Sequence, residues 1–303
     1  MTLFDAYLMV DWTASSKPKL GKDSIWLAVA VRTGDELKLE APVNLSTRSA
    51  AEARVRELLR AMLARELRVL VGFDFPYGYP KGFAAAVGSP GELAPWRENW
   101  NRLSRAVRDD ARNQNNRFEV AADLNAKLGP SPGPFWGCPA IRQTEALRST
   151  ACPFPYAGAN RAPLERRRTA EQRLRGVQEV WKLYGNGSVG SQALVGIPRV
   201  AALRDDEALA SVSRVWPFET GFSDCPTPVR GPFALHAEIW PGIVPIDPSQ
   251  HAIRDAAQVL TLVRHVAALD DRGDLGALFR VPSPLEPADL AACIAEEGWI
   301  LGA

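Results

Sequence analysis

Four strand-like segments, in a particular order near the start of the chain, narrow the choice of fold more than any other part of the sequence. Three apolar segments lie close together at residues 6–12, 24–32 and 37–43. A helical pattern from about residue 49 then leads to a fourth, at residues 68–74. Short connections join antiparallel neighbours, whereas parallel strands need a longer crossover. We therefore expect an antiparallel meander, with the fourth strand parallel to the first.

The crossover segment carries the signals of an amphipathic helix. Ser49 and Glu52 stand at the spacing of a capping box, in which each side chain satisfies a free backbone N–H of the first helical turn. Apolar residues recur behind them at helical spacing, at Ala51, Val55, Leu58, Leu59 and Met62. The sequence therefore predicts a helix between the third and fourth strands.

The C-terminal part predicts three further elements of the same domain. These are a fifth strand at residues 233–239, a long helix at 249–269 and a short helix at 287–296. The order of strands and helices predicts an α/β fold, with a mixed five-stranded sheet flanked by helices. We interpret residues 1–303 as a single domain of this kind.

A large insertion separates the fourth and fifth strands. Proline- and glycine-rich loops alternate here with helical patterns. The patterns lie near residues 92–108, 117–128 and 164–184, with a short strand at 213–219. We therefore expect residues 81–230 to form a mostly helical insertion within the domain.

Composition excludes several classes of protein. The 36 basic residues nearly balance the 35 acidic ones, so no net field draws the chain to nucleic acid or to an anionic membrane. No apolar run approaches the length of about 18 residues that spans a bilayer. The N-terminus lacks the basic start of a signal peptide, and the four cysteines are scattered. We expect a cytoplasmic protein with reduced thiols and no membrane partner.

Four acidic residues occur where the sequence otherwise indicates buried structure. Asp11 ends the apolar run YLMVD and Asp74 ends VLVGFD. Glu238 lies inside ALHAEIWP, and Asp255 lies in the helical segment HAIRDAAQVLTLVRHV. Buried carboxylates are unfavourable unless a cation balances them. Because the first and fourth strands are expected to be neighbours, Asp11 and Asp74 are expected to meet at the same edge of the sheet.

Helical phase gives Asp255 a direction. At about 3.6 residues per turn, Asp255 shares a face with the apolar residues of its helix, namely Val259, Leu262, Val263 and Val266. It is therefore expected to face the sheet. Two structural alternatives remain open. Aspartate commonly follows a strand in a turn, and it also stabilises the first turn of a helix.

Clustered carboxylates favour a divalent cation. Mg²⁺ and Mn²⁺ prefer oxygen ligands, and two such ions about 3.5–4 Å apart promote the hydrolysis of phosphodiesters. The sequence therefore suggests Mg²⁺ or Mn²⁺ at Asp11, Asp74, Glu238 and Asp255.

The chain also resembles a known group of proteins. The order of its elements is similar to the RNase H-like fold, and four motifs resemble an uncharacterised family of predicted RNase H-like nucleases: VDWTASS, VGFDFPYGYP, EIWP and RDAAQVL. The resemblance implies metal-dependent hydrolysis of nucleic acid by Asp11, Asp74, Glu238 and Asp255, and it is the main support for Glu238. In many such enzymes the second acid is a glutamate, and either Asp74 or Glu238 can take that place.

Two other functions stay open. Lys17 follows Asp11 closely, and a glycine-rich segment at 182–192 contains Lys182, Ser188 and Ser191. Such residues suit a phosphate at a helix N-terminus, although Gly185 also suits a simple helix end. This favours a phosphate- or nucleotide-binding protein, or a phosphotransferase, with a phosphorylated small molecule as partner. Similar sequences are also associated with molybdopterin or cobalamin biosynthesis, which implies a non-catalytic accessory role that no residue here explains.

Overall fold

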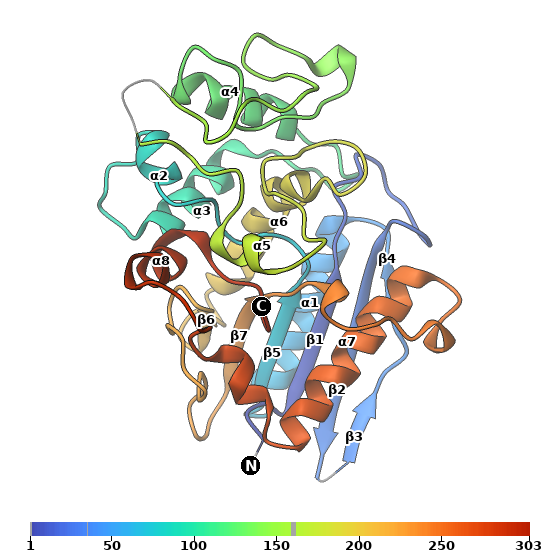
Figure 1. The fold of residues 1–303 in the computed structure, drawn as a ribbon. Coiled ribbons are helices and arrows are strands. Elements are labelled where there is room, and N and C mark those ends of the chain that lie inside the picture. Colours follow the sequence, from blue (N-terminus) through green and yellow to red (C-terminus); the bar gives the residue numbers. More distant parts are fainter. Residues whose placement is uncertain (1, 35, 159–161) are drawn as a thin grey trace.

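The computed structural model describes residues 2–34, 36–158 and 162–303, and it shows a mixed sheet covered by helices on both faces (Figure 1). The strands are β1 (Ala6–Asp11), β2 (Ile25–Thr33), β3 (Glu36–Leu39), β4 (Val43–Leu45), β5 (Arg68–Phe73), β6 (Ser213–Val215) and β7 (Phe233–Glu238). Their order across the sheet is β3-β2-β1-β5-β7-β6, and β4 also pairs with β2.

The directions of the central strands confirm the predicted topology. β1 is antiparallel to β2 and parallel to β5, and β7 is parallel to β5. The expected number of strands was too low, because the described residues form a seven-stranded sheet. The predicted third strand is two short strands, β3 and β4, which pair with different parts of β2. In addition, β6 lies parallel to β7 at the edge.

The α-helices of the described residues are α1 (Arg48–Leu63), α2 (Phe83–Ala86), α3 (Pro95–Ala106), α4 (Arg117–Leu128), α5 (Thr169–Arg173), α6 (Val189–Arg204), α7 (Arg254–Asp271) and α8 (Pro287–Ala292). The short 3₁₀ helices are η1 (Ala140–Arg142), η2 (Pro241–Ile243), η3 (Pro248–Gln250) and η4 (Leu275–Phe279), and a π-helical turn, η5 (Cys293–Glu297), follows α8. In Figure 1, α7 crosses one face of the sheet over β1 and β2, and α1 lies on the other face.

The start of α1 differs from the predicted capping box. The N-cap is Thr47, whose side chain accepts a hydrogen bond from the amide of Ala50. Ser49 therefore lies inside the first turn, where it cannot act as a cap. Glu52 instead forms salt bridges with Arg56 and Arg199. The prediction was wrong by two residues because a threonine and a serine both stand before the apolar stripe.

The insertion is less helical than predicted. The helices near 92–108 and 117–128 are present as α3 and α4, but the expected helix at 164–184 is reduced to the short α5. The bounds of α6 were not predicted from the sequence. This helix is buried on most of its surface and contains Gly196 and Pro198, so it lacks the one-sided apolar stripe that marks an amphipathic helix.

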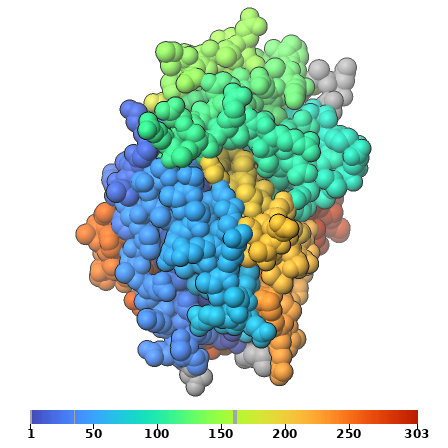
Figure 2. All heavy atoms as spheres, turned by 180° about the vertical axis from the view of Figure 1, so that it is seen from behind, coloured from blue at the N-terminus to red at the C-terminus, as the bar shows by residue number. Residues whose placement is uncertain are grey.

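Alternation along the strands builds a separate hydrophobic core on each face of the sheet. Leu8 and Val10 of β1 pack into one core with α1 and the insertion, whereas Tyr7 and Met9 pack into the other with α7. Trp100 and Trp181 of the insertion belong to the first core. Seen from behind, α1 and α6 lie side by side over that face (Figure 2). The insertion is therefore packed onto the sheet next to the end of β1.

Candidate functional site

Asp11 and Asp74 lie side by side at the ends of two parallel strands. Val10 of β1 is paired in register with Phe73 of β5, and each aspartate is the next residue along. The amide of Asp74 donates to the carbonyl of Val10 at 3.3 Å. The two side chains are close enough for each to affect the pKa of the other. The predicted meeting of these two acids is confirmed.

Burial dominates the electrostatics of this pair, and neighbouring acidic charges add to its effect. Burial raises the pKa of Asp11 well above its usual value, and the charges of Asp74 and Asp255 raise it further. Burial also raises the pKa of Asp74 to about 7, although hydrogen bonds from Asp11 and from the amide of Trp12 oppose this shift. Both shifts favour the protonated form of these side chains over that of an isolated aspartate.

Asp255 lies near the pair, in the first turn of α7. The apolar residues of its predicted face are buried against the sheet, and its charge contributes to the raised pKa of both Asp11 and Asp74. Its Oδ2 atom accepts a hydrogen bond of 2.5 Å from the amide of Asp23. Across the described parts of the chain, no three His, Cys, Asp or Glu side chains form a ready-made metal cluster. The site is thus a close pair with a third acid beside it.

Glu238 has a different environment. It lies at the end of β7, in register with Phe73, but its carboxylate is bound by Arg168. The two guanidinium contacts measure 2.8 and 2.6 Å, and the amide of Tyr77 donates to the same carboxylate at 3.0 Å. Arg168 balances its charge, so Glu238 is a member of a buried ion pair. The prediction that Glu238 is a free carboxylate available to a metal was therefore wrong.

Other buried acids also have a partner. Asp109 pairs with the buried Arg48, and Glu171 pairs with Arg168. Asp270 accepts hydrogen bonds from two backbone amides and from the hydroxyl of Tyr7. Asp11 and Asp74 have no salt bridge to any residue that the structure describes, and they differ from Asp270 because they lie next to each other. Two adjacent acids without a cationic partner make this strand end a candidate site for a cation.

Two cavities adjoin the acids. The first, of ≈ 670 Å³, is lined by Asp74, Lys182 and Arg254 among others. The second, of ≈ 810 Å³, lies between the loop after β1 and the start of α6. Gly187 and Gln192 line both. The Gln192 side chain donates to the carbonyl of Trp12 at 2.6 Å, and the amide of Trp12 donates to Asp74 at 2.6 Å. The cavities and the acid pair are thus parts of one connected region.

The structure separates the predicted phosphate contacts. Lys182 lines the first cavity, and its Nζ donates to the carbonyl of Asn186 at 2.6 Å. Ser188 lines the second cavity and precedes α6, but its side chain makes no capping hydrogen bond. The hydroxyl of Ser191 donates to the carbonyl of Leu183 and accepts from the Nε of Arg117. Lys17 is exposed and lines neither cavity.

Part of the glycine-rich segment serves packing. A Cβ atom on Gly190 would lie 2.1 Å from the carbonyl oxygen of Val180, so only glycine allows this close approach. The amide of Gly190 donates to the carbonyl of Lys182 at 3.0 Å. Gly185 has a φ of 88°, which places a tight turn before α6. Gly190 therefore allows the start of α6 to pack closely against residues 180–182, and Lys182 and Ser188 are among the residues of the segment that line the cavities.

Sequence reasoning missed several residues that line these cavities. They are Arg117, Gln192, Arg254 and Gln258. Arg117 stands in an arginine-rich stretch, and nothing in that stretch distinguishes a buried arginine from exposed ones. Gln192 could have been predicted as a lining residue, because it is the last residue of the glycine-rich segment 182–192.

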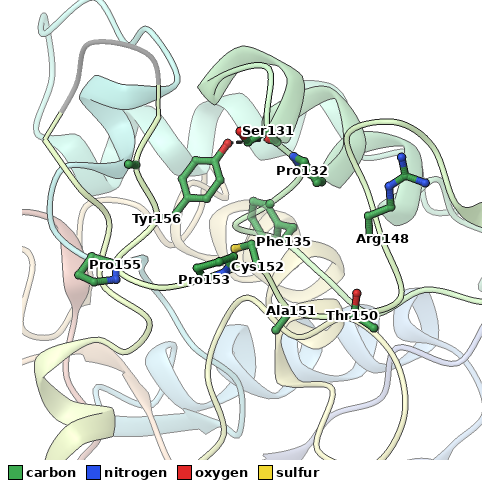
Figure 3. Close-up of a pocket in the computed structure, with 12 residues that line it drawn as sticks. Ser131, Pro132, Phe135, Arg148, Thr150, Ala151, Cys152, Pro153, Pro155 and Tyr156 are labelled. Carbon is green, nitrogen blue, oxygen red and sulfur yellow. Dashed lines mark hydrogen bonds between the residues drawn. The ribbon is translucent and has the colours of Figure 1, made fainter.

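A further cavity of ≈ 490 Å³ lies within the insertion and contains a cysteine (Figure 3). Tyr156 closes one side of it by donating a hydrogen bond of 2.8 Å to the carbonyl of Ser131. Burial raises the pKa of the Cys152 thiol to about 11. Because the thiolate is the nucleophilic form, this cysteine is poorly suited to catalysis, and the acid pair remains the strongest candidate site.

Comparisons of the chain with models of protein families, with curated proteins and with solved structures found no match. A search of the described helices also found none that is both long and apolar enough to cross a bilayer. The function must therefore be inferred from the geometry of the site.

Proposed function

We propose that the protein is a phosphodiester hydrolase that depends on Mg²⁺ or Mn²⁺, bound at Asp11 and Asp74 with Asp255 nearby. One observation carries the proposal: two partly buried carboxyl groups lie side by side at the ends of adjacent parallel strands, with no cationic partner among the described residues. A divalent cation would balance their charge. The order and directions of β1, β2, β5 and β7 support the resemblance to RNase H-like proteins.

The donor set suits these ions. Mg²⁺ typically retains several water molecules and binds through one or two carboxylates together with substrate phosphates. A close pair of carboxylates therefore suffices, and a compact cluster of three is not required. Glu238 is left out of the proposed site because Arg168 already balances its charge. Asp255 is able to act as a third ligand, directly or through water. In the structure its carboxylate accepts a hydrogen bond from the amide of Asp23.

The residues of the chain have separate tasks in the proposed reaction. When bound, the metal supplies a Lewis acid and a source of hydroxide near neutral pH. Asp11 and Asp74 would hold the metal in their ionised form and fix the reacting centre. Lys182 and Arg254 line the adjoining cavity and favour an anionic substrate there. Gln192 holds the main chain of Trp12, whose amide holds Asp74 in place.

A phosphotransferase or nucleotide-binding protein is the second candidate. Lys182 and Ser188 line the two cavities beside the acid pair, as expected of contacts to nucleotide phosphates. This candidate predicts thermal stabilisation by ATP that is lost in Lys182→Met. The hydrolase predicts no such dependence on ATP. No described residue favours the accessory role in molybdopterin or cobalamin biosynthesis.

Titration with Mn²⁺ tests the proposed metal site. We expect the wild type to bind Mn²⁺ in calorimetry and to cleave an oligonucleotide or bis(p-nitrophenyl) phosphate. Asp11→Asn should weaken Mn²⁺ binding by about 100-fold or more, because it removes one of two charged ligands. Asp274→Asn is the control, since Asp274 is an exposed acid that pairs with Arg272 beyond the C-terminal end of α7. It should change Mn²⁺ affinity by less than about threefold.

Two results would overturn the metal site. One is a wild-type protein that does not bind Mn²⁺. The other is an Asp11→Asn variant that binds Mn²⁺ as tightly as the wild type. If Mn²⁺ binds but neither diester is cleaved, the metal site stands and the hydrolase does not.

A further inference from the structure

Arg117 is a buried cation without an anionic partner. It opens α4, its side chain lines the ≈ 810 Å³ cavity, and only 8% of its surface is exposed. Its Nε donates to the Ser191 hydroxyl, and its Nη1 donates to Ser16 and Asn115, all at 2.8–2.9 Å. These partners are neutral, and Nη2 makes no hydrogen bond to any residue within the described ranges.

The two arginines that are buried most completely show what is unusual about Arg117. Arg48 pairs with Asp109, and Arg168 pairs with Glu171 and Glu238. Arg117 forms no such salt bridge in the described parts of the chain. Burial, together with the positive charge of Arg48, lowers the pKa of Arg117 to about 10. An anion entering the cavity would therefore relieve a real electrostatic imbalance.

The surroundings of Arg117 suit a phosphate. Ser188 lines the same cavity with a hydroxyl that does not cap α6. The amide end of α6, which carries a partial positive charge, also lies here. Asp23 is the acidic residue of the lining, and it is exposed and paired with Lys19 at 3.2 Å. The described lining thus combines a buried arginine, a free hydroxyl and a helix N-terminus.

The Arg117 cavity is connected to the acid pair. Gln192 and Gly187 line both this cavity and the one that contains Asp74. Gln192 also binds the main chain of Trp12, the residue that follows Asp11. The unbalanced acids and the unbalanced arginine therefore lie along one continuous lining. A chain of phosphates with a metal at one position would balance both.

We propose that the Arg117 cavity binds a second, uncleaved phosphate of the substrate, so that the protein acts on an oligonucleotide strand and not on an isolated phosphate ester. This inference rests on the proposed hydrolase for its account of the first phosphate. The second phosphate requires no metal, because an arginine holds it. Binding in the presence of a chelator therefore separates the two proposals.

Fluorescence anisotropy with a labelled short single-stranded oligonucleotide in EDTA is the test. The wild type should bind, and Arg117→Met should bind about tenfold or more weakly, since a charge-assisted hydrogen bond to phosphate is lost. The slope of log affinity against log salt should also fall by about one. Arg112→Met, which removes an exposed arginine five residues away, is the control and should change binding by less than about twofold.

A second variant guards against simple misfolding of Arg117→Met. Ser16 is exposed and accepts from Arg117, so Ser16→Glu should supply the missing anion. It should raise the melting temperature and still weaken oligonucleotide binding by about tenfold. Inorganic phosphate should compete with the oligonucleotide in the wild type only.

Unchanged oligonucleotide binding in both Arg117→Met and Ser16→Glu overturns the Arg117 proposal. Failure of Mn²⁺ binding, with Arg117-dependent binding intact, overturns the metal site alone.

Discussion

Asp74→Asn is expected to make the metal-free protein more stable at about pH 8. Burial raises the pKa of Asp74 to about 7 in the folded state, whereas the unfolded value is near 3.9. Between about pH 4 and about pH 7, Asp74 binds more protons in the folded state than in the unfolded state. The free energy of unfolding therefore falls as pH rises towards about 7, and the whole loss of stability remains above pH 7. Asparagine does not titrate, and its Oδ1 atom can still accept from the amide of Trp12. The gain should be on the order of 2–4 kcal/mol.

Urea denaturation across the pH range, with EDTA present, measures this effect. The stability difference between Asp74→Asn and the wild type should be large above about pH 7 and should shrink as pH falls towards about 4. Adding Mn²⁺ should stabilise the wild type by mass action and leave the variant unchanged. Asp274→Asn again serves as the control, with a difference within about 0.5 kcal/mol. A variant less stable than the wild type at every pH would contradict the raised pKa of Asp74.

Arg168→Met is expected to destabilise the protein more than any other single change considered. Arg168 is fully buried and binds Glu171, Glu238 and the carbonyl of Glu297. It therefore joins α5, β7 and the C-terminal turn. Even beside Arg168, burial raises the pKa of Glu171 to about 7. Removing the cation leaves two buried carboxyl groups without a balancing charge, at a cost of about 3–5 kcal/mol.

The exposed Arg142 provides a control. It pairs with Glu119, and about half of each side chain is exposed, so Arg142→Met should lower the free energy of unfolding by no more than about 1 kcal/mol. Adding Glu238→Gln to Arg168→Met should restore part of the loss, because one uncompensated charge disappears. Chemical denaturation of the single and double variants measures both effects. Similar losses in Arg142→Met and Arg168→Met would show that the buried pair has no special role.

The central sheet was predictable because its evidence is local. Apolar runs, short connections and one helical crossover set the directions of β1, β2 and β5, and those directions bring Asp11 and Asp74 together. Helical phase likewise gave the buried face of α7. Each of these inferences uses only the spacing of residues within one or two neighbouring elements.

The environment of Glu238 was not predictable in the same way. Its partner Arg168 is 70 residues away in the chain and belongs to the insertion. No local pattern indicates whether a buried acid will meet an arginine or a metal. The same limit applies to Arg117, whose burial depends on contacts with Ser16 and Ser191. Salt bridges between distant segments determine which ionic groups remain free to bind a ligand. Such pairings cannot be read from local sequence patterns.

The hydrogen bonds at Trp12 have a consequence for how the chain can vary. The Trp12 amide donates to the Asp74 carboxylate, and the Trp12 carbonyl accepts from the Gln192 side chain. Trp12 thus contributes only main-chain atoms to both hydrogen bonds. The indole can be replaced without cutting either link, provided that the new residue is not proline, which has no N–H. The indole is nevertheless buried against Phe73 and Phe75, so its replacement should lower stability through lost packing while both hydrogen bonds remain. Loss of the Gln192 side chain would instead remove the hydrogen bond that ties α6 to Trp12.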